Sequence, residues 1–194
     1  MDIEYEATFP EIDKTTVRER LVRVGAELVK PEFLQKRVVF HLPKGHEVPG
    51  GWLRVRDESD RITLSLKIVD GNRITNQKEL LLGVSDFESA VNLLLTLGCI
   101  RKSYQETKRE LWRIDGVEVT LDEWPFLKPF VEIEGVSEAM VHRVAEKLGF
   151  EYDQAVFGAV DVMYMRQYPH LTADRINNQT PLILFEGENP FLDS

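Results

Sequence analysis

The chain has few of the side chains that usually form disulfides or bind transition metals. Of its 194 residues only Cys99 is cysteine, and four are histidine. A single cysteine excludes an internal disulfide and a zinc site built from several thiolates. The histidines show no metal-ligand spacing such as HExxH. Cys99 lies between Gly98 and Ile100, where a helix is expected to give way to a strand, so we expect a buried structural thiol.

Long apolar runs are also missing. The stretch VNLLLTLG at residues 91–98 is too short to cross a bilayer, and the start of the chain shows no signal-like pattern. We therefore expect a cytoplasmic protein with no membrane partner.

Positive charge is scarce as well. The chain has 24 Lys and Arg against 33 Asp and Glu, a formal net charge of -9. A general binder of nucleic acid polymers needs clustered basic residues along the phosphate backbone, so we expect no such partner. A small polyanionic ligand is not excluded, because the local charge of a site matters more than the total.

Two hydrophobic periods divide the chain into elements. Apolar residues three and four apart predict amphipathic helices at 13–24, 86–97 and 137–148, each followed by a glycine that can end it. Alternation predicts strands at 35–42, 52–58, 61–69, 76–83, 104–114, 117–124 and 129–135, besides the N-terminal stretch DIEYEATFP. Because hairpin signals such as IDGVEV join these strands, we predict an α+β fold with an antiparallel sheet or barrel and the helices packed outside.

Several of these strands carry a charged face and an apolar face. Residues i and i+2 share a face of a strand, which groups Glu4 with Glu6, Arg54 with Arg56, Ser65 with Lys67, Thr120 with Asp122, and Glu132 with Glu134. A sheet with one solvated face gives such a pattern, and most alternating charges in proteins have that origin. Here, however, the charges are sorted by strand into acids, arginines and a lysine. The second interpretation is a barrel whose charged interior binds a metal–polyphosphate ligand.

The same residues match a series of family motifs. Glu4-Tyr5-Glu6-Ala7-Thr8 corresponds to an ExExK signature. LRVR, LSLK and Glu79 correspond to a middle block, and Lys108-Arg109, VTLD and FVEIE correspond to a second half. In this order they resemble the CYTH superfamily, also called triphosphate tunnel metalloenzymes, which includes class IV adenylate cyclases, thiamine triphosphatases and inorganic triphosphatases. The match runs from residue 2 to about 150, and five motifs in series are specific where one would be weak.

The resemblance implies a fold, a site and an activity. The fold would be a closed antiparallel β-barrel around a hydrophilic tunnel. The implied catalytic residues are Glu4, Glu6, Lys67, Glu79 and Asp122. The implied substrate-binding residues are Arg54, Arg56, Lys67 and Arg109. The implied metal ligands are Glu4, Glu6, Glu132 and Glu134, with Mg²⁺ or Mn²⁺ as cofactor.

The implied activity is that of a metal-dependent phosphohydrolase or nucleotidyl cyclase. Its substrate would be a small molecule bearing a triphosphate, such as ATP, thiamine triphosphate or inorganic triphosphate. The implied reaction is attack at a phosphorus atom, with water or a ribose 3′-hydroxyl as the nucleophile.

Two positions depart from the family pattern. Thr8 stands where ExExK has its lysine, and Leu127, Lys128 and Pro129 replace a usual LG. The loss of a cation at Thr8 leaves an alternative open, a non-catalytic protein that binds a nucleotide or polyphosphate. Lys36, Arg37 and Lys78 are candidates for a replacement charge, and the sequence does not choose among them.

The rest of the chain gives weaker signals. We assign residues 1–168 to the CYTH domain and residues 169–194 to an irregular C-terminal arm with one apolar island at 182–185. Trp52, Trp112 and Trp124 are predicted to be core residues rather than stacking platforms for a base. The helices could support a homodimer, although the sequence shows no interface.

Overall fold

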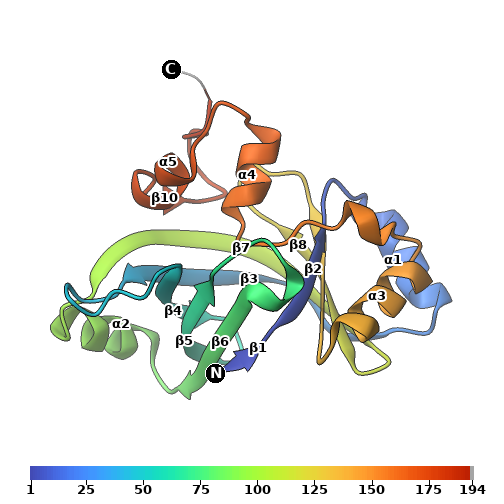
Figure 1. Cartoon of the computed structure of the whole chain (residues 1–194), viewed down its shortest axis with the longest axis horizontal. Coiled ribbons are helices and arrows are strands. Elements are labelled where there is room, and N and C mark those ends of the chain that lie inside the picture. The colour runs from blue at the N-terminus through green and yellow to red at the C-terminus, as the bar shows by residue number, and fades with distance from the viewer. Residues whose placement is uncertain (193–194) are drawn as a thin grey trace.

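One curved sheet dominates the structure, a computed structural model that describes residues 1–192 (Figure 1). Its strands are β1 (Asp2–Ile3), β2 (Tyr5–Phe9), β3 (Glu27–His41), β4 (Gly51–Asp57), β5 (Ile62–Val69), β6 (Gln77–Val84), β7 (Ile100–Ile114), β8 (Val117–Glu123), β9 (Phe130–Gly135) and β10 (Leu182–Ile183). All strands predicted from the alternation are present. The sequence had not shown that β3 begins as early as Glu27.

The sheet forms a nearly closed antiparallel barrel. Its hydrogen-bonded order is β1-β6-β5-β4-β3-β7-β8-β9-β2, and β10 pairs with β7 outside this path. Only Glu4 separates β1 from β2, so one N-terminal segment pairs with β6 at one end of the order and with β9 at the other. This segment closes the barrel that the resemblance predicted. The β10–β7 pair is the exception to the antiparallel pattern.

The predicted hairpin at IDGVEV joins β7 to β8. Asp115 and Gly116 at its tip have φ values of 52° and 78°. Positive φ at both central residues is typical of a type I′ turn, whose twist matches that of the two strands. The turn therefore fixes the register in which Arg109 lies opposite Asp122.

The three predicted helices pack outside the barrel (Figure 1). They are α1 (Lys14–Arg23), α2 (Phe87–Thr96) and α3 (Glu138–Lys147), each capped at its start by the side chain of Asp13, Asp86 or Ser137. The glycines expected to end them, Gly25, Gly98 and Gly149, have φ values of 77°, 84° and 76°. Side chains other than glycine are strained in this left-handed region, which explains why glycine stands there.

Four shorter helical segments were not predicted. They are η1 (Ile74–Asn76), η2 (Tyr152–Gln154), α4 (Asp161–Gln167) and α5 (Ala173–Asn178). An amphipathic period needs a window of about 11 residues or more to be recognised, and these segments are shorter than that.

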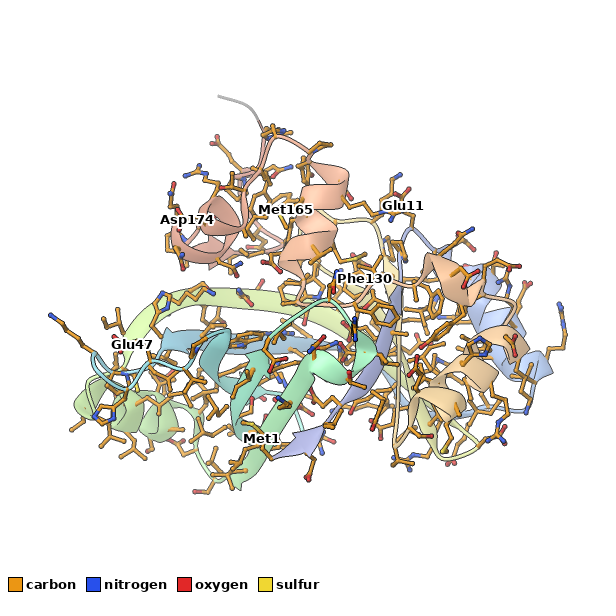
Figure 2. The ribbon with its side chains drawn as sticks, in the orientation of Figure 1. Met1, Glu11, Glu47, Phe130, Met165 and Asp174 are labelled. Atoms are coloured by element: carbon orange, nitrogen blue, oxygen red, sulfur yellow. The ribbon has the colours of Figure 1, made fainter. Side chains whose placement is uncertain are left out.

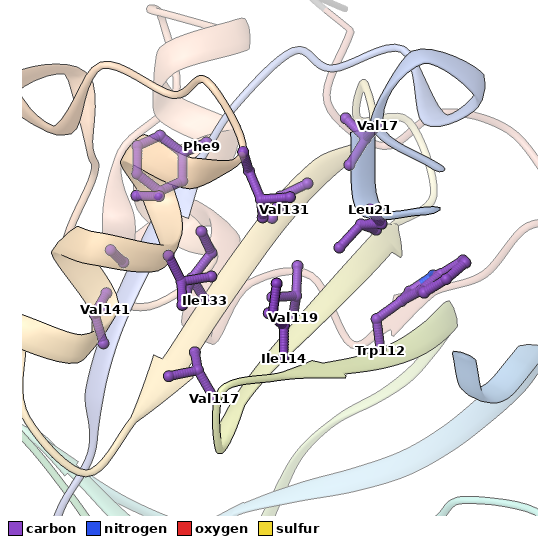
Figure 3. Close-up of a cluster of buried hydrophobic side chains, with 14 of the residues drawn as sticks. Phe9, Val17, Leu21, Trp112, Ile114, Val117, Val119, Val131, Ile133 and Val141 are labelled. Carbon is purple, nitrogen blue, oxygen red and sulfur yellow. The ribbon is translucent and has the colours of Figure 1, made fainter. Parts of the chain in front are cut away.

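Helices α1 and α3 cover the apolar outer face of β2, β8 and β9. Leu21, Val119, Val131, Ile133 and Val141 are fully buried there (Figure 3). A second cluster lies under α2 and includes the buried thiol of Cys99, as expected. Because the helices cover the apolar faces, the charged faces of the same strands point into the barrel.

A third cluster joins the C-terminal segment to the barrel. Phe130 of β9 packs with residues of α4, α5 and β10 (Figure 2). The side chains of Tyr164, Ile183 and Phe191 are at most 1% exposed. Within the arm predicted to be irregular, the structure has two short elements, α5 and β10, while Asp193 and Ser194 lie outside the described residues. The domain boundary at residue 168 stays a prediction.

No helix within residues 1–192 combines the length and the apolar character that crossing a membrane requires.

Candidate functional site

The barrel encloses a cavity of about 1020 Å³. Its walls include nearly all of the charged residues singled out by the sequence: Glu4, Glu6, Arg54, Arg56, Lys67, Glu79, Arg109, Glu132 and Glu134. The charged strand faces therefore point inward, and the interpretation as a solvated sheet face does not hold. Asp122 is the one predicted site residue that does not line the cavity, since it is completely buried behind Arg109.

Strand register brings these side chains together. Lys67 of β5 lies opposite Glu79 of β6, and Arg109 of β7 lies opposite Asp122 of β8. Directly opposed residues of an antiparallel pair point to the same side of the sheet, which explains why bases meet acids on the inner face.

Arg109 is held by two carboxylates. Its Nε and Nη2 donate to Asp122 Oδ1 and Oδ2 at 2.7 and 2.6 Å, and Nη2 also donates to Glu132 Oε2 at 2.6 Å. Burial alone would raise the pKa of Asp122, but the Arg109 guanidinium outweighs it and lowers that pKa. Thr120 Oγ1 donates a further hydrogen bond to Asp122 at 2.9 Å. Asp122 is thus a charged support that orients Arg109 toward the cavity.

A second network joins β4, β5 and β6 to the N-terminal strand. Lys67 Nζ lies 2.9 Å from Glu4 Oε2, and Arg54 Nη2 donates to Glu79 Oε1 at 2.9 Å. Burial opposes the charged form of Lys67, yet Glu6 and Glu4 raise its pKa. Glu79 behaves in the same way, since Arg54 outweighs burial and lowers the Glu79 pKa to about 2.

The acidic side of the cavity is formed by β2 and β9. Glu6 lies opposite Glu134, and Glu132 is the next inward residue on β9. Burial raises the pKa of both Glu132 and Glu134, and the nearby Glu6 carboxylate adds to the rise. Burial likewise raises the pKa of Glu4 to about 7. Crowded carboxylates of this kind favour a bound cation.

The donor chemistry of these acids fits Mg²⁺ or Mn²⁺, because both prefer carboxylate oxygens. In residues 1–192 no group of three or more His, Cys, Asp or Glu side chains is already arranged as a metal site. Glu4 and Glu132 instead contact Lys67 and Arg109. Metal binding at Glu4, Glu6, Glu132 and Glu134 would therefore have to replace some of these ion pairs.

The basic side of the cavity is formed by β3 and β4. Arg56 Nη2 lies 2.6 Å from Glu58 Oε1, and burial, followed by the charge of Arg54, lowers the Arg56 pKa to about 10. The Nε atoms of Arg37, Arg54 and Arg56 are buried and donate no hydrogen bond to any described residue. Unpaired buried donors of this kind are costly, so this side favours an anionic ligand that can accept from them.

Arg37 lines the cavity, although the sequence did not distinguish it from two other candidates for a replacement charge. Of the three candidates for a replacement charge, Lys36 is exposed and Lys78 pairs with Asp70 at 3.0 Å near the surface, whereas Arg37 is 5% exposed and lines the cavity. The alternation of faces along β3 did not decide whether Arg37 points inward. Arg37 shares its face with apolar Val39, and the other face carries the charge of Lys36, so neither face is clearly the charged one.

Thr8 does not reach the cavity surface. Its side chain is 6% exposed, and its backbone exchanges two hydrogen bonds with Val156.

The prediction that all three tryptophans are core residues is confirmed only in part. Trp112 is a core residue, Trp124 belongs to the third cluster but also lines the cavity, and Trp52 is half-buried at the cavity wall.

Comparison with known proteins gives one family and several similar folds. A family model described as the CYTH domain matches residues 3–156. A conserved hypothetical protein from Pyrococcus furiosus is 22% identical with a TM-score of 0.65, and the match covers 78% of this chain and 94% of that protein. No curated protein sequence matches the chain.

Two further solved structures are similar. A Vibrio parahaemolyticus protein described as a candidate adenylate cyclase is 11% identical with a TM-score of 0.70, covering 84% of this chain and 97% of that one. A Hippeastrum protein described as a candidate adenylyl cyclase with a dominant triphosphatase activity is 14% identical with a TM-score of 0.55, and the match covers 89% of this chain and 98% of that one. At such identities the likeness concerns the fold alone.

Proposed function

The chain belongs to the CYTH domain family, and on this premise we propose that it is a divalent-metal-dependent enzyme acting on a small molecule that bears a triphosphate. The observation that carries the proposal is the separation of charge inside the cavity. Arginines of β4 line one side, and glutamates of β2 and β9 line another. A triphosphate complexed with a divalent cation presents the complementary charges.

The bases would bind the triphosphate. Arg54, Arg56 and Arg109 offer planar guanidinium groups that can donate two parallel hydrogen bonds to phosphate oxygens, and Lys67 adds a point charge. Glu79 and Asp122 would act as positioning residues, because each holds one of these arginines through a hydrogen-bonded ion pair. As charge develops on the phosphoryl oxygens, the fixed cations would stabilise it without reorganising.

The acids would bind the cation and the nucleophile. Glu4, Glu6, Glu132 and Glu134 would hold Mg²⁺ or Mn²⁺, which supplies charge neutralisation at the phosphoryl oxygens when bound. A cavity carboxylate would accept a hydrogen bond from the attacking hydroxyl and orient it toward phosphorus.

Two nucleophiles are compatible with this cavity. Water attacking the terminal phosphorus breaks its bond to the bridging oxygen, releases inorganic phosphate and leaves a proton to solvent. A ribose 3′-hydroxyl attacking the α-phosphorus yields a cyclic nucleotide and pyrophosphate. We put hydrolysis first because it needs no group beyond the triphosphate to be held in place. Both proteins with similar folds are described as candidate adenylate cyclases, and the description of the Hippeastrum protein adds a dominant triphosphatase activity.

Product analysis tests the proposal. Purified protein is incubated with Mg²⁺ or Mn²⁺ and, separately, with ATP, thiamine triphosphate and inorganic triphosphate. Release of phosphate supports a triphosphatase, and a cyclic nucleotide with pyrophosphate supports a cyclase. If none of the three is turned over while metal-dependent binding is measured, catalysis is excluded and binding stands.

Thr8 favours a second candidate, a non-catalytic binder of nucleotides or polyphosphate. β2 brings no cation to the cavity, and the Thr8 side chain is buried beneath the segment around Val156. We expect Thr8→Lys to raise the turnover of a weakened enzyme and to leave a pure binder inactive. Thr15→Lys, on the exposed first turn of α1, is the control for an added lysine.

A further inference from the structure

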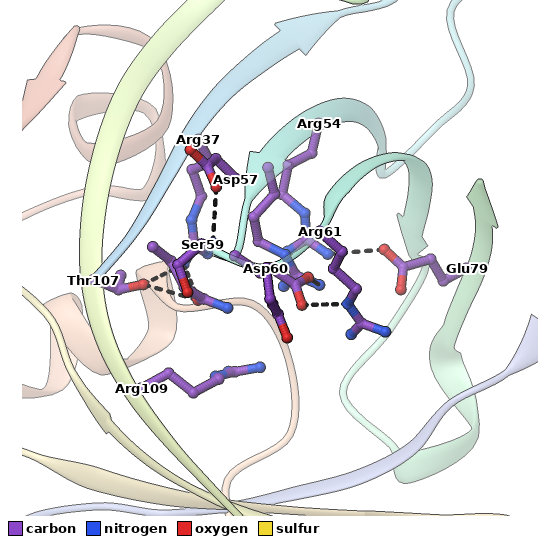
Figure 4. A network of polar contacts seen from close by, with 12 residues as sticks. Arg37, Arg54, Asp57, Ser59, Asp60, Arg61, Glu79, Thr107 and Arg109 are labelled. Carbon is purple, nitrogen blue, oxygen red and sulfur yellow. Dashed lines mark hydrogen bonds and ion pairs between the residues drawn. The ribbon is translucent and has the colours of Figure 1, made fainter. Parts of the chain in front are cut away.

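Arg37 differs from the other arginines of the cavity in its partners. Its Nη2 donates to Gln35 Oε1 at 3.0 Å and to Thr107 Oγ1, both neutral groups. Its guanidinium carbon lies 4.6 Å from the centre of the Trp124 ring. Figure 4 shows Arg37, Arg54 and Arg109 reaching from three strands toward one space.

Every other arginine on the cavity wall contacts a carboxylate. The pairs are Arg54 with Glu79, Arg56 and Arg61 with Glu58, Arg109 with Asp122, and Arg113 with Glu118. Arg37 makes no ion pair with any residue in the part of the chain that the structure describes. Its Nε is also buried and donates no hydrogen bond within residues 1–192.

The surroundings of Arg37 make the burial of its charge more unfavourable in the ligand-free protein. It lies directly opposite Arg56 in the β3–β4 register. Burial, followed by the charges of Arg54 and Arg56, lowers the pKa of Arg37 well below its ordinary value. A guanidinium stays protonated in proteins near neutral pH, so the group is a buried cation. The Asp122 carboxylate offsets part of the unfavourable effect from a distance, but no acid within residues 1–192 forms an ion pair with Arg37. Burying such a charge is unfavourable unless a counter-ion compensates it.

The neutral partners explain how the group is held. Gln35 and Thr107 are at most 1% exposed and hydrogen-bond to one another as well as to Arg37. Trp124, the residue that follows the end of β8, lies against the guanidinium group. These contacts fix the direction of the guanidinium while leaving its charge available to a ligand.

We infer that Arg37 is an anion-binding residue of the tunnel, which together with Arg54 and Arg56 binds phosphate oxygens and supplies the cation that the chain lacks at Thr8. The identity of the anion as a triphosphate rests on the proposed function. The role of Arg37 as an anion-binding group rests on its own geometry.

The test uses the full chain and three variants that each replace one cation by glutamine. Arg37→Gln removes the unpaired cation, Arg54→Gln breaks an ion pair with Glu79, and Lys36→Gln removes the exposed charge of the preceding residue. Melting temperature is measured without ligand, and dissociation constants are measured by calorimetry for inorganic triphosphate with Mg²⁺ and for sulfate.

The expected results have opposite signs for the two buried arginines. Ligand-free Arg37→Gln melts higher than the natural protein, because a buried charge without an ion-pair partner is gone, whereas Arg54→Gln melts lower because Glu79 loses its partner. Arg37→Gln binds triphosphate about ten- to a hundredfold more weakly, the loss expected for a charge-assisted hydrogen bond. Lys36→Gln changes neither quantity.

The outcomes separate this inference from the proposed function. If Arg37→Gln binds triphosphate as tightly as the natural protein, the inference is overturned and the proposed function stands. If sulfate binds through Arg37 but triphosphate does not bind, the proposed function is overturned and the inference stands. A ligand-free Arg37→Gln that melts lower, with unchanged affinity, assigns the side chain a structural role only. Binding of neither anion overturns both.

Discussion

Asp122 illustrates at the scale of one residue how a fully buried side chain orients one that lines the cavity. Its side chain does not reach the cavity, yet it accepts hydrogen bonds from both Nε and Nη2 of Arg109. A two-point contact leaves the guanidinium little freedom to rotate. The ion pairs that hold the cavity bases therefore set the geometry available to a ligand.

We predict that Asp122→Asn is strongly destabilising. The change removes the carboxylate that Arg109 contacts at two points and leaves only its single contact with Glu132. Breaking a buried pair from one side costs about 3 kcal/mol or more. The free energy of unfolding is measured with urea.

Asp115→Asn is the matched control for that variant. Asp115 pairs with Lys147 at the surface at 3.1 Å, and asparagine tolerates its positive φ of 52°. Its cost should stay below about 1 kcal/mol. Equal effects of the two substitutions on the free energy of unfolding would show that the buried Asp122–Arg109 pair contributes no more to stability than a surface ion pair.

Tyr164 gives a prediction about pH. Its buried phenol donates a hydrogen bond to the Pro125 carbonyl at 2.8 Å, and burial raises its pKa well above the ordinary value of about 10. The unfolded chain loses this proton from about pH 10 upward while the folded chain keeps it, so the folded state loses stability as pH rises above that point. We expect the natural protein to be more stable than Tyr164→Phe near pH 8 and this advantage to shrink as pH rises above about 10. Urea unfolding of both proteins near pH 8 and above about pH 10 measures the difference between their free energies of unfolding. A difference that does not change with pH would contradict the raised pKa of Tyr164.

At the scale of elements, the C-terminal segment is part of the folded unit although the family match ends at residue 156. Phe191 is completely buried against Tyr164, with ring centres 4.4 Å apart, and Asp161, Val162, Asn177 and Asn178 contribute to the cavity wall. The apolar contacts of α4, α5 and β10 therefore hold polar side chains at the cavity.

We predict that Phe191→Ala lowers the free energy of unfolding by about 3–5 kcal/mol, the usual cost of removing a buried aromatic ring. Leu192→Ala is the neighbouring control, because Leu192 is 65% exposed, and it should change stability by less than about 0.5 kcal/mol. Urea unfolding measures both. A small effect at Phe191 would mean that the segment is only loosely attached.

At the scale of the whole molecule, the barrel places bases of β4 and β5 and acids of β2 and β9 around one enclosed volume. The net charge of -9 therefore does not describe the cavity, where the buried Nε atoms of Arg37, Arg54 and Arg56 donate no hydrogen bond to any residue that the structure describes. A cation and a polyanion can each neutralise a different wall, so their binding should be coupled.

We predict that Mg²⁺ and inorganic triphosphate stabilise the protein more together than the sum of their separate effects. A ligand at a concentration a hundred times its dissociation constant adds about 2.7 kcal/mol of stability. Coupling raises this stabilisation, because the first ligand increases the affinity of the protein for the second. Thermal melts with each ligand alone, with both, and with a chelator measure the effect. Additive shifts would argue against a shared site for metal and phosphate.

The local pattern of the sequence predicted most of the fold. Helix limits, glycine ends and strand faces depend on residues near one another in the chain, and so does the sharing of one face by Arg54 and Arg56 and by Glu132 and Glu134. That these faces point into a barrel was implied by the family resemblance. Short segments such as α4 and α5 escaped because they hold too few residues to show a period.

Only the tertiary structure decided which charges are neutralised. That Arg109 is held by Asp122 follows from the register of the β7–β8 hairpin, and that Arg37 faces Arg56 follows from the register of β3 with β4. The burial of Thr8 follows from the segment around Val156, which is distant in the chain. Periodicity gives the face of a strand on which a residue lies. The partner it meets there is set by strand register and barrel closure, which depend on the packing of the whole chain.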